Sequence, residues 1–270
     1  MSRPEWRNVG GGRWLVECSG LAEFLNPGPR AVAFNRSEEG TYSFTGTATY
    51  AGAVAVMRDG WPDGAEAARK LAASLSAEAT GAEATQRPAA VWDVAGDDVD
   101  VDRFLSGEPE SMVAWEPDYV PAAGRVVRVV LDGSVNCDVG AEYLRVAGVM
   151  TAAAVDVLEA RGVRCEVWVS YSSNFRNKET VEIRHRLKAA EEPLDLPRVV
   201  AGMHPSAFRR IGFRWMETRA ECPSGYGWNA EASRAEGDLL FPAGQISRIA
   251  EADRAEWLRK QAETVLGVAA

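Results

Sequence analysis

The feature that most constrains the fold is an alternation of strand and helix patterns that begins near residue 125. Residues 126–131 are a nearly continuous run of apolar, mostly β-branched residues, which is typical of a strand buried on both faces. Residues 141–161 then form a long stretch that is apolar almost all round, and Gly162 follows as a stop signal. This order predicts an α/β fold, with a mostly parallel sheet and helices on both of its faces.

Three further strands and a closing helix continue the pattern. Residues 163–171, 180–187 and 238–241 have strand character, and residues 246–266 have the spacing of a helix. The second and third strands are separated by a loop short enough for an antiparallel hairpin. Charges occupy every second position of residues 180–187, so we expect an antiparallel strand at one edge of the sheet, with His185 at the surface. The pattern of residues 198–218 predicts a helix that is broken at His204-Pro205.

Charge divides the chain of 270 residues, which has a net charge of −9. Residues 1–120 hold 19 acidic and 10 basic residues, whereas residues 121–270 hold 20 of each. We therefore predict an acidic, mainly helical N-terminal region over 1–121, with helices near 49–58 and 63–77, and an α/β domain over 122–270. The acidic excess disfavours nucleic-acid binding, because it repels phosphates. Residues 164–219 carry 11 basic and 7 acidic residues, which predicts a modest basic surface that the acidic region could cover.

Cysteine and histidine usage argues against a zinc site. The four cysteines, Cys18, Cys137, Cys165 and Cys222, are scattered, and only two histidines exist. Scattered cysteines are typical of free thiols in a reducing compartment. The first residues lack the apolar core of a signal peptide, and no apolar run is long enough for a membrane span. We expect a cytoplasmic protein that does not enter a membrane. Phosphate-binding glycine loops and a nucleophile elbow are absent from the sequence.

The candidate site follows the first strand of the predicted sheet. Asp132 and Ser134 come directly after that strand, and Asn136 and Asp138 lie close behind. Carboxylate, hydroxyl and amide oxygens are ligands for hard cations such as Mg²⁺ or Mn²⁺. The second strand ends in Ser172, Ser173 and Asn174, which we expect to line the same crevice, because ligands bind at the carboxyl ends of parallel strands. The alternative is a simple turn and helix cap at Asp132-Gly133-Ser134, and a hairpin turn at the serines.

Residues 122–270 resemble a von Willebrand factor A-type domain. The resemblance rests on the Asp-x-Ser spacing after a buried strand, on the long apolar helix and on the strand pair that follows. That family carries Asp-x-Ser-x-Ser at a metal-ion-dependent adhesion site. Asp132 and Ser134 match its first two positions, whereas Asn136 replaces the third, and Phe241-Pro242 stands where the family has an Asp. The resemblance implies a Rossmann-like fold and a non-enzymatic protein-interaction module, in which a cation binds an acidic residue of the partner. An AAA+ ATPase is a candidate partner, because some family members are linked to such enzymes.

The N-terminal part has a second resemblance, to uncharacterised proteins of tailed bacteriophages. It is carried by residues 43–47, Asp59-Gly60-Trp61 and residues 100–109, and it implies a phage origin. Two alternatives to the interaction module stay open. One is a metal-dependent hydrolase or transferase, in which Asp132 holds the cation with help from Ser134 and Asp138. The other is a phage structural or host-takeover protein in which the site is vestigial.

Overall fold

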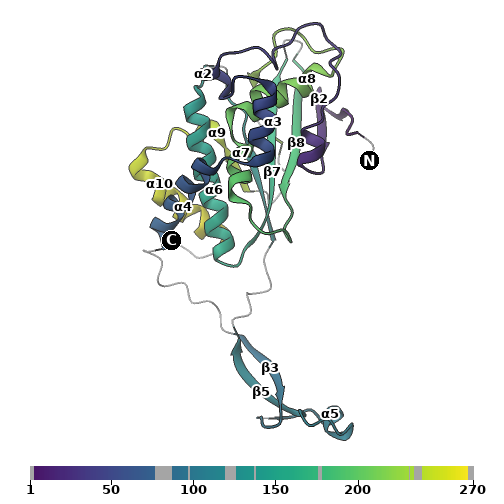
Figure 1. Ribbon diagram of the computed structural model, residues 1–270, viewed down its shortest axis with the longest axis vertical. Helices are drawn as coiled ribbons and strands as arrows, with labels where there is room; N and C mark the ends of the chain where they lie inside the picture. Colours follow the sequence, from purple (N-terminus) through teal and green to yellow (C-terminus); the bar gives the residue numbers. More distant parts are fainter. Residues whose placement is uncertain are drawn as a thin grey trace. The chain divides into compact units, whose positions relative to one another are not determined.

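The chain forms two compact units rather than the two consecutive regions predicted from charge. The structure, a computed structural model, describes residues 3–76, 87–96, 98–118, 126–136, 138–175, 178–230, 232–233 and 239–266. Residues 1–78 and 126–270 make up the main unit, and residues 79–125 form an inserted unit (Figure 1). The boundary expected between residues 121 and 122 is therefore replaced by two boundaries, because N-terminal strands belong to the main sheet.

The main unit is built on a seven-stranded mixed sheet, as the α/β prediction requires. Six strands lie in the order β1-β2-β8-β7-β6-β10, and β9 pairs with β7. β10, β6 and β7 are parallel, β2 and β8 are parallel to each other, and the two groups meet antiparallel at β7 and β8. The bounds are β1 Arg7–Gly10, β2 Arg13–Cys18, β6 Val126–Asp132, β7 Arg164–Asn174, β8 Thr180–Lys188, β9 Trp228–Asn229 and β10 Leu239–Pro242.

β8 lies inside the sheet, so its predicted place at an edge is wrong. β2 pairs along its length, and β1 forms the antiparallel edge instead. The glycines at residues 10–12 are typical of a loop, so the sequence pattern did not predict these two strands. Among the charges of β8, Glu182 is fully buried and Arg184 nearly so, because Ser233 packs against both, whereas Arg186 is partly exposed. His185, expected at the surface, is also buried, and its ring stacks on Phe24 with the ring centres 3.9 Å apart.

The helices of the described main unit gather on one face of the sheet, not on both. Around α6 pack α4, α7, α9 and α10, while α3 and α8 pack against the π-helix η1. Within the described ranges, no helix is both long and apolar enough to cross a bilayer. The bounds are α1 Leu21–Phe24, α2 Tyr42–Thr45, α3 Tyr50–Asp59, α4 Pro62–Ser76, α6 Ala141–Ala160, α7 Leu196–Gly202, η1 Ala207–Gly212, α8 Phe213–Glu217, α9 Ala243–Ile246, the 3-10 turn η2 Glu251–Asp253 and α10 Arg254–Leu266.

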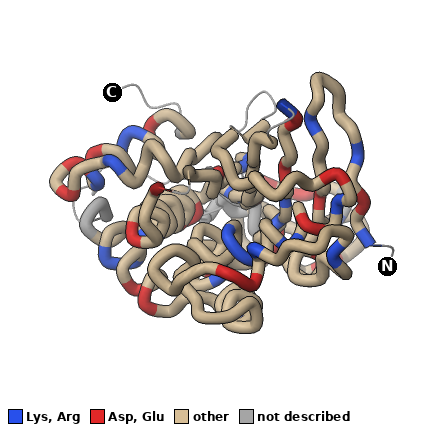
Figure 2. The backbone as a smooth tube through the Cα atoms, turned by 90° about the horizontal axis from the view of Figure 1, so that it is seen from above, with Lys and Arg blue, Asp and Glu red and all other residues tan. Residues whose placement is uncertain are grey.

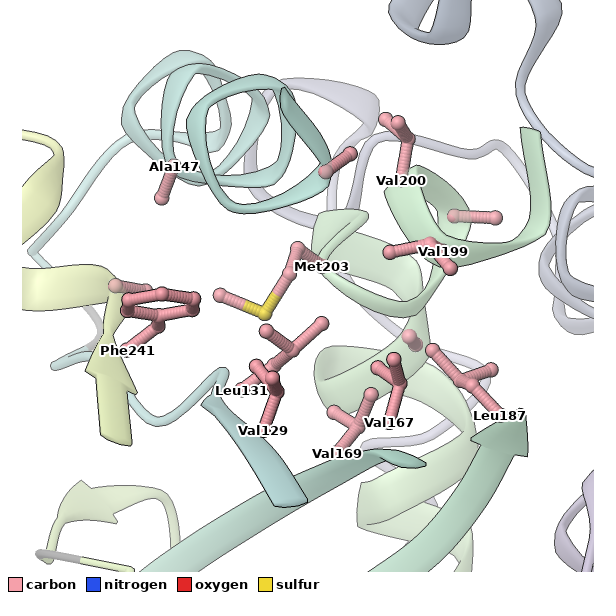
Figure 3. Close-up of a cluster of buried hydrophobic side chains, with 14 of the residues drawn as sticks. Val129, Leu131, Ala147, Val167, Val169, Leu187, Val199, Val200, Met203 and Phe241 are labelled. Atoms are coloured by element: carbon pink, nitrogen blue, oxygen red, sulfur yellow. The ribbon is translucent and has the colours of Figure 1, made fainter. Parts of the chain in front are cut away.

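Several of these helices follow the sequence pattern closely. The helices predicted over 49–58, 63–77 and 141–161 correspond to α3, α4 and α6, and the break at His204-Pro205 is confirmed between α7 and η1. The closing helix predicted over 246–266 is divided into α9 and α10. The core lies between α6, α7 and the sheet, where Met203 fits between Phe241 and the valines of β6 and β7 (Figure 3).

The inserted unit is a small antiparallel sheet that the sequence analysis did not foresee. Its strands are β3 Arg87–Asp93, β4 Asp98–Val99 and β5 Met112–Asp118, with β5 in the middle, and the helix α5 spans Val101–Leu105 (Figure 1). The small, polar residues 78–90 have the composition of a flexible connection, but β3 begins within this stretch, and residues 78–86 lie outside the described ranges. The acidic residues 93–102 have the composition of a solvated loop, but they contain β4 and the start of α5.

Two buried arginines of η1 fasten an N-terminal loop to the main unit. Arg210 is fully buried, and its guanidinium donates to backbone oxygens of Ser37, Glu38, Gly40, Thr47 and Ala48 and to the hydroxyls of Thr45 and Thr47. Arg209 donates to the backbone oxygens of Phe44, Asn136 and Val139. Burying a charge is unfavourable unless its donors are satisfied, and here the carbonyl groups satisfy them. Arg209 thereby joins residue 44 of the loop to the segment after β6.

The substitution Arg210→Lys tests this anchor. Lysine has three donors on one nitrogen and cannot reach the same set of oxygens, so buried carbonyls would lose their partners. We expect the free energy of unfolding to fall by about 3 kcal/mol, measured by urea denaturation. Arg248→Lys, at an exposed arginine, is the matched control and should leave the stability nearly unchanged. Equal stability of the two variants would contradict the anchoring role.

Candidate functional site

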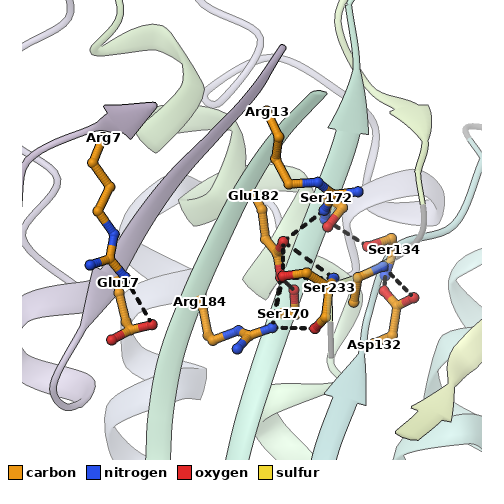
Figure 4. Close-up of polar contacts among 11 residues, drawn as sticks. Arg7, Arg13, Glu17, Asp132, Ser134, Ser170, Ser172, Glu182, Arg184 and Ser233 are labelled. Carbon is orange, nitrogen blue, oxygen red and sulfur yellow. Dashed lines mark hydrogen bonds and ion pairs between the residues drawn. The ribbon is translucent and has the colours of Figure 1, made fainter. Parts of the chain in front are cut away.

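Asp132 and Ser134 lie together at the carboxyl end of β6, under residues 232–233. The Asp132 carboxylate accepts hydrogen bonds from the Ser134 backbone N–H (2.9 Å), the Ala232 N–H (3.3 Å) and the Ser134 hydroxyl (Figure 4). Burial raises the pKa of Asp132 to about 6, although these hydrogen bonds oppose the shift. A residue with a side chain cannot replace Gly133, because a Cβ there would lie 2.7 Å from the Tyr171 ring. The Asp-Gly-Ser sequence thus forms a closed turn.

A second buried carboxylate, Glu182 of β8, lies near Asp132 on the same face of the sheet. It accepts hydrogen bonds from the hydroxyls of Ser170 and Ser233 (both 2.6 Å) and ion pairs from Arg13 and Arg184 (Figure 4). Burial by itself would raise the pKa of Glu182. The hydroxyl hydrogen bonds and the two arginines outweigh burial and lower this pKa below its usual value. The pKa values of these neighbouring carboxylates are therefore shifted in opposite directions, because among the described residues the hydroxyl and arginine partners gather at Glu182.

The three residues predicted to line the crevice point in different directions. The Ser172 N–H donates to the Ser134 hydroxyl (2.7 Å), and the buried Ser172 hydroxyl has no hydrogen-bonding partner among the described residues. Ser173, on the opposite face of β7, accepts from the Gly227 N–H (2.9 Å). Asn174 is exposed and bonds the Asn229 carbonyl and Thr180. Only Ser172 joins Asp132 and Ser134 in one cluster.

Asn136 and Asp138 belong to a neighbouring pocket rather than to the Asp132 cluster. The Asn136 amide oxygen accepts from the Asn229 N–H (3.0 Å), so it faces β9. The pocket encloses about 590 Å³. Its lining combines four aromatic side chains, three charged ones and polar backbone: Arg36, Glu39, Gly40, Phe44, Asn136, Asp138, Phe213, Tyr226, Gly227 and Trp228. Trp228 is 63% exposed, which is unusual for a tryptophan.

Buried Glu217 of α8 fixes two walls of this pocket. Its carboxylate accepts from the N–H and hydroxyl of Ser37 and from the phenol of Tyr226. Ser37 adjoins Arg36 in one wall, and Tyr226 itself lines another. The guanidinium of Arg36 lies 5.5 Å from the centre of the Tyr226 ring. The pocket is therefore held by the same helical segment, 207–217, that anchors the N-terminal loop.

The donors around Asp132 do not fit a Mg²⁺ or Mn²⁺ site. A cation needs several oxygen ligands with free lone pairs, whereas three N–H or O–H donors already point at this carboxylate. The Ser134 hydroxyl both donates to Asp132 and accepts from Ser172, and Asn136 and Asp138 face the pocket. Among the described residues, no three His, Cys, Asp or Glu side chains come together as a metal site would require.

Sequence reasoning missed most of the side chains that build this region. Glu182 and Arg184 carried the alternating pattern of an exposed strand, and Arg13, Ser233 and the arginines of η1 gave no local signal. One signal was present: Tyr226 and Trp228 each follow a glycine in a polar stretch that has no apolar period of a helix or a strand. The remaining residues meet only through long-range contacts, so their chain positions could not reveal them.

Comparison with known families assigns the chain a family but no activity. The model of a family described as a domain of unknown function, DUF7192, matches residues 9–266. Since this is nearly the whole chain, the chain belongs to that family. No curated protein and no solved structure matches it.

The substitution Asp132→Asn tests the buried carboxylate. The folded state holds the Asp132 proton more tightly than the unfolded chain does, so ionisation of Asp132 favours unfolding. This cost is absent below the usual pKa of 3.8 and complete above about 6. Relative to the variant, the wild type should lose about 3 kcal/mol of unfolding free energy across that window, measured by urea denaturation at several pH values. Asp253→Asn, at an exposed carboxylate, gives the baseline, and a stability difference independent of pH would contradict the assignment.

Calorimetric titration with Mg²⁺ or Mn²⁺ tests the conclusion about the cation. Because amide and hydroxyl protons surround the Asp132 carboxylate, we expect the same heats for the wild type and for Asp132→Asn. A saturable heat in the wild type that the variant lacks would overturn this conclusion and restore the cation site.

Proposed function

We propose that this member of the DUF7192 family is a non-enzymatic protein-interaction module whose partner occupies the pocket beside the carboxyl end of β6. The observation that carries the proposal is the pocket lining, in which Phe44, Phe213, Tyr226 and Trp228 stand among Arg36, Glu39 and Asp138. Tryptophan, tyrosine and arginine dominate the binding energy of protein interfaces. An exposed tryptophan at such a pocket is the kind of side chain that a partner covers.

The side chains of this pocket are better suited to binding a partner protein than to catalysing a reaction. The histidines and the described cysteines are buried outside this pocket. Burial lowers the pKa of His185 to about 3 and that of His204 to about 4, and it raises the pKa values of the described thiols to about 12. The metal-dependent hydrolase or transferase is less favoured, because the Asp132 carboxylate on which it depends is enclosed by hydrogen-bond donors.

A relation to von Willebrand factor A-type domains is part of the proposal. The order β8-β7-β6-β10, with the Asp-x-Ser turn at the end of an interior strand and an antiparallel β7–β8 pair, supports it. In that family the strand ends face the partner, and the pocket lies at the corresponding ends here. The contact would differ in chemistry, because aromatic and charged side chains replace the cation. An AAA+ ATPase as the partner, and a phage origin, stay predictions from the sequence.

The substitution Trp228→Ala tests the function. The tryptophan side chain is exposed and β9 pairs through its backbone, so the variant should fold normally. Tagged wild type, Trp228→Ala and Val9→Ala, whose exposed valine lies on the edge strand β1, are recovered from native cells and their bound proteins quantified by mass spectrometry. We expect one protein to be retained by the wild type and Val9→Ala and lost from Trp228→Ala. With that protein purified, Trp228→Ala should bind about tenfold more weakly or worse.

Two results would contradict the proposed function. One is equal recovery of every bound protein with all three chains. The other is turnover of phosphate esters or nucleotides by the wild type that Asp132→Asn abolishes, since this would favour the hydrolase.

A further inference from the structure

The inserted unit concentrates the exposed apolar side chains of this protein. Eleven large apolar side chains are exposed in the described part of the chain, and six lie between residues 92 and 105: Trp92, Val94, Val99, Val101, Phe104 and Leu105. Phe104 is 64% exposed and Leu105 is 77% exposed. Scattered apolar residues on a surface need no explanation, but a contiguous group of them marks an interaction site. We call residues 92–105 the apolar tip.

The apolar tip is structurally defined, although its apolar side chains are not buried. The Trp92 indole donates to the Asp100 carboxylate (3.0 Å), and the Arg103 guanidinium lies 4.7 Å from the centre of the Trp92 ring. Arg103 also pairs with Glu108 (3.4 Å) and donates to the Glu110 carbonyl (3.2 Å). These contacts fix α5 against β3 and the following turn. Phe104 and Leu105 are therefore presented by an ordered element, which lowers the entropy cost of binding.

Charge indicates what covers the apolar tip. The inserted unit, residues 79–125, holds ten acidic and three basic residues, so it carries −7 of the net −9 of the chain. Exposed acidic residues such as Asp93, Asp98 and Glu110 lie among the apolar ones. This combination repels nucleic-acid and anionic lipid phosphates, and two copies of the unit would repel each other. The complementary surface has apolar side chains surrounded by Arg and Lys.

The main unit has no excess of basic residues that would make it the complementary surface. Five of the eleven basic residues counted in residues 164–219 are buried, namely Arg184, Lys188, Arg209, Arg210 and Arg219. The basic surface predicted there is therefore partly internal. The main unit as a whole is close to neutral, with nine acidic and eight basic residues in 1–78 and twenty and nineteen in 126–270, and positions of both signs are intermingled along its backbone (Figure 2).

We propose that the apolar tip of the inserted unit is a docking surface for a second protein that presents apolar side chains within a basic surround. Phe104 and Leu105 supply the central apolar contact, and the surrounding carboxylates select a basic partner and steer its approach. This surface lies in a different unit from the pocket at β6, so it stands or falls independently of the function proposed for that pocket.

Binding of defined peptides to the full chain tests the docking surface. The probes are a labelled amphipathic helical peptide with Leu on one face and Arg on the other, and its counterpart with Glu in place of Arg. Fluorescence anisotropy compares the wild type with Phe104→Ser/Leu105→Ser and with Val9→Ser/Tyr143→Ser, a matched pair of exposed apolar residues in the main unit. A third variant, Asp93→Asn/Asp98→Asn/Glu110→Gln, removes charge without changing shape. Because all of these side chains are exposed, circular dichroism should confirm that each variant folds.

We expect the Arg peptide to bind the wild type, the main-unit control and Trp228→Ala equally, and the Glu peptide not to bind. Phe104→Ser/Leu105→Ser should weaken binding about tenfold or more, and the charge variant should bind more weakly with a shallower salt dependence. The proposal is overturned if the Arg peptide fails to bind or binds every chain alike. It is also overturned if loss of Phe104 and Leu105 instead abolishes self-association, measured by sedimentation, or binding to phosphatidylserine vesicles.

Discussion

Two buried guanidinium groups on consecutive residues hold together the part of this protein that carries its pocket. Arg209 and Arg210 lie in a π-helix, a geometry that often occurs at functional sites. Arg210 satisfies the carbonyls of an N-terminal loop, and Arg209 joins that loop to the segment after β6. Since arginine presents five donors in a fixed plane, two side chains hold a loop whose regular secondary structure is the short helix α2. The pocket walls exist because this segment connects regions that are far apart in the sequence.

On the polar face of the sheet, buried carboxylates are likewise surrounded by hydrogen-bonding partners. Two buried carboxylates lie near each other. Burial dominates the pKa of Asp132, whereas at Glu182 the serine hydroxyls and two arginines together outweigh burial. Residues 232 and 233 complete both groups, because the Ala232 N–H reaches Asp132 and Ser233 reaches Glu182. A sequence motif that resembles a cation site is in this way a closed hydrogen-bonded cluster. The proposed partner would instead contact the aromatic pocket beside it.

The acidic excess of the chain lies in a different part of the protein than the count along the sequence suggested. Counted along the chain, the acidic excess belongs to the first 120 residues, and it predicted an acidic region that precedes the α/β domain. In the structure most of it belongs to an insertion of 47 residues, while the N-terminal strands and helices complete the nearly neutral main unit. The count over the first 120 residues could not separate the N-terminal part of the main unit from the insertion, because that range contains both of them. The proposed docking surface rests on this acidic unit with its exposed apolar tip.

The sequence by itself determined the elements whose pattern is local. The buried run of β6, the long apolar helix α6, the paired helices α3 and α4 and the break at Pro205 follow from hydrophobic period and backbone chemistry, which act within a few residues. Only the tertiary structure decided which faces are covered, because that depends on partners distant in the chain. β2 turned the half-charged β8 from an edge strand into an interior one, and residues 232–233 closed Asp132. Likewise, Asn136 and Asp138 lie close to Asp132 in sequence but serve the pocket, since their hydrogen-bonding and lining partners come from β9 and the N-terminal loop.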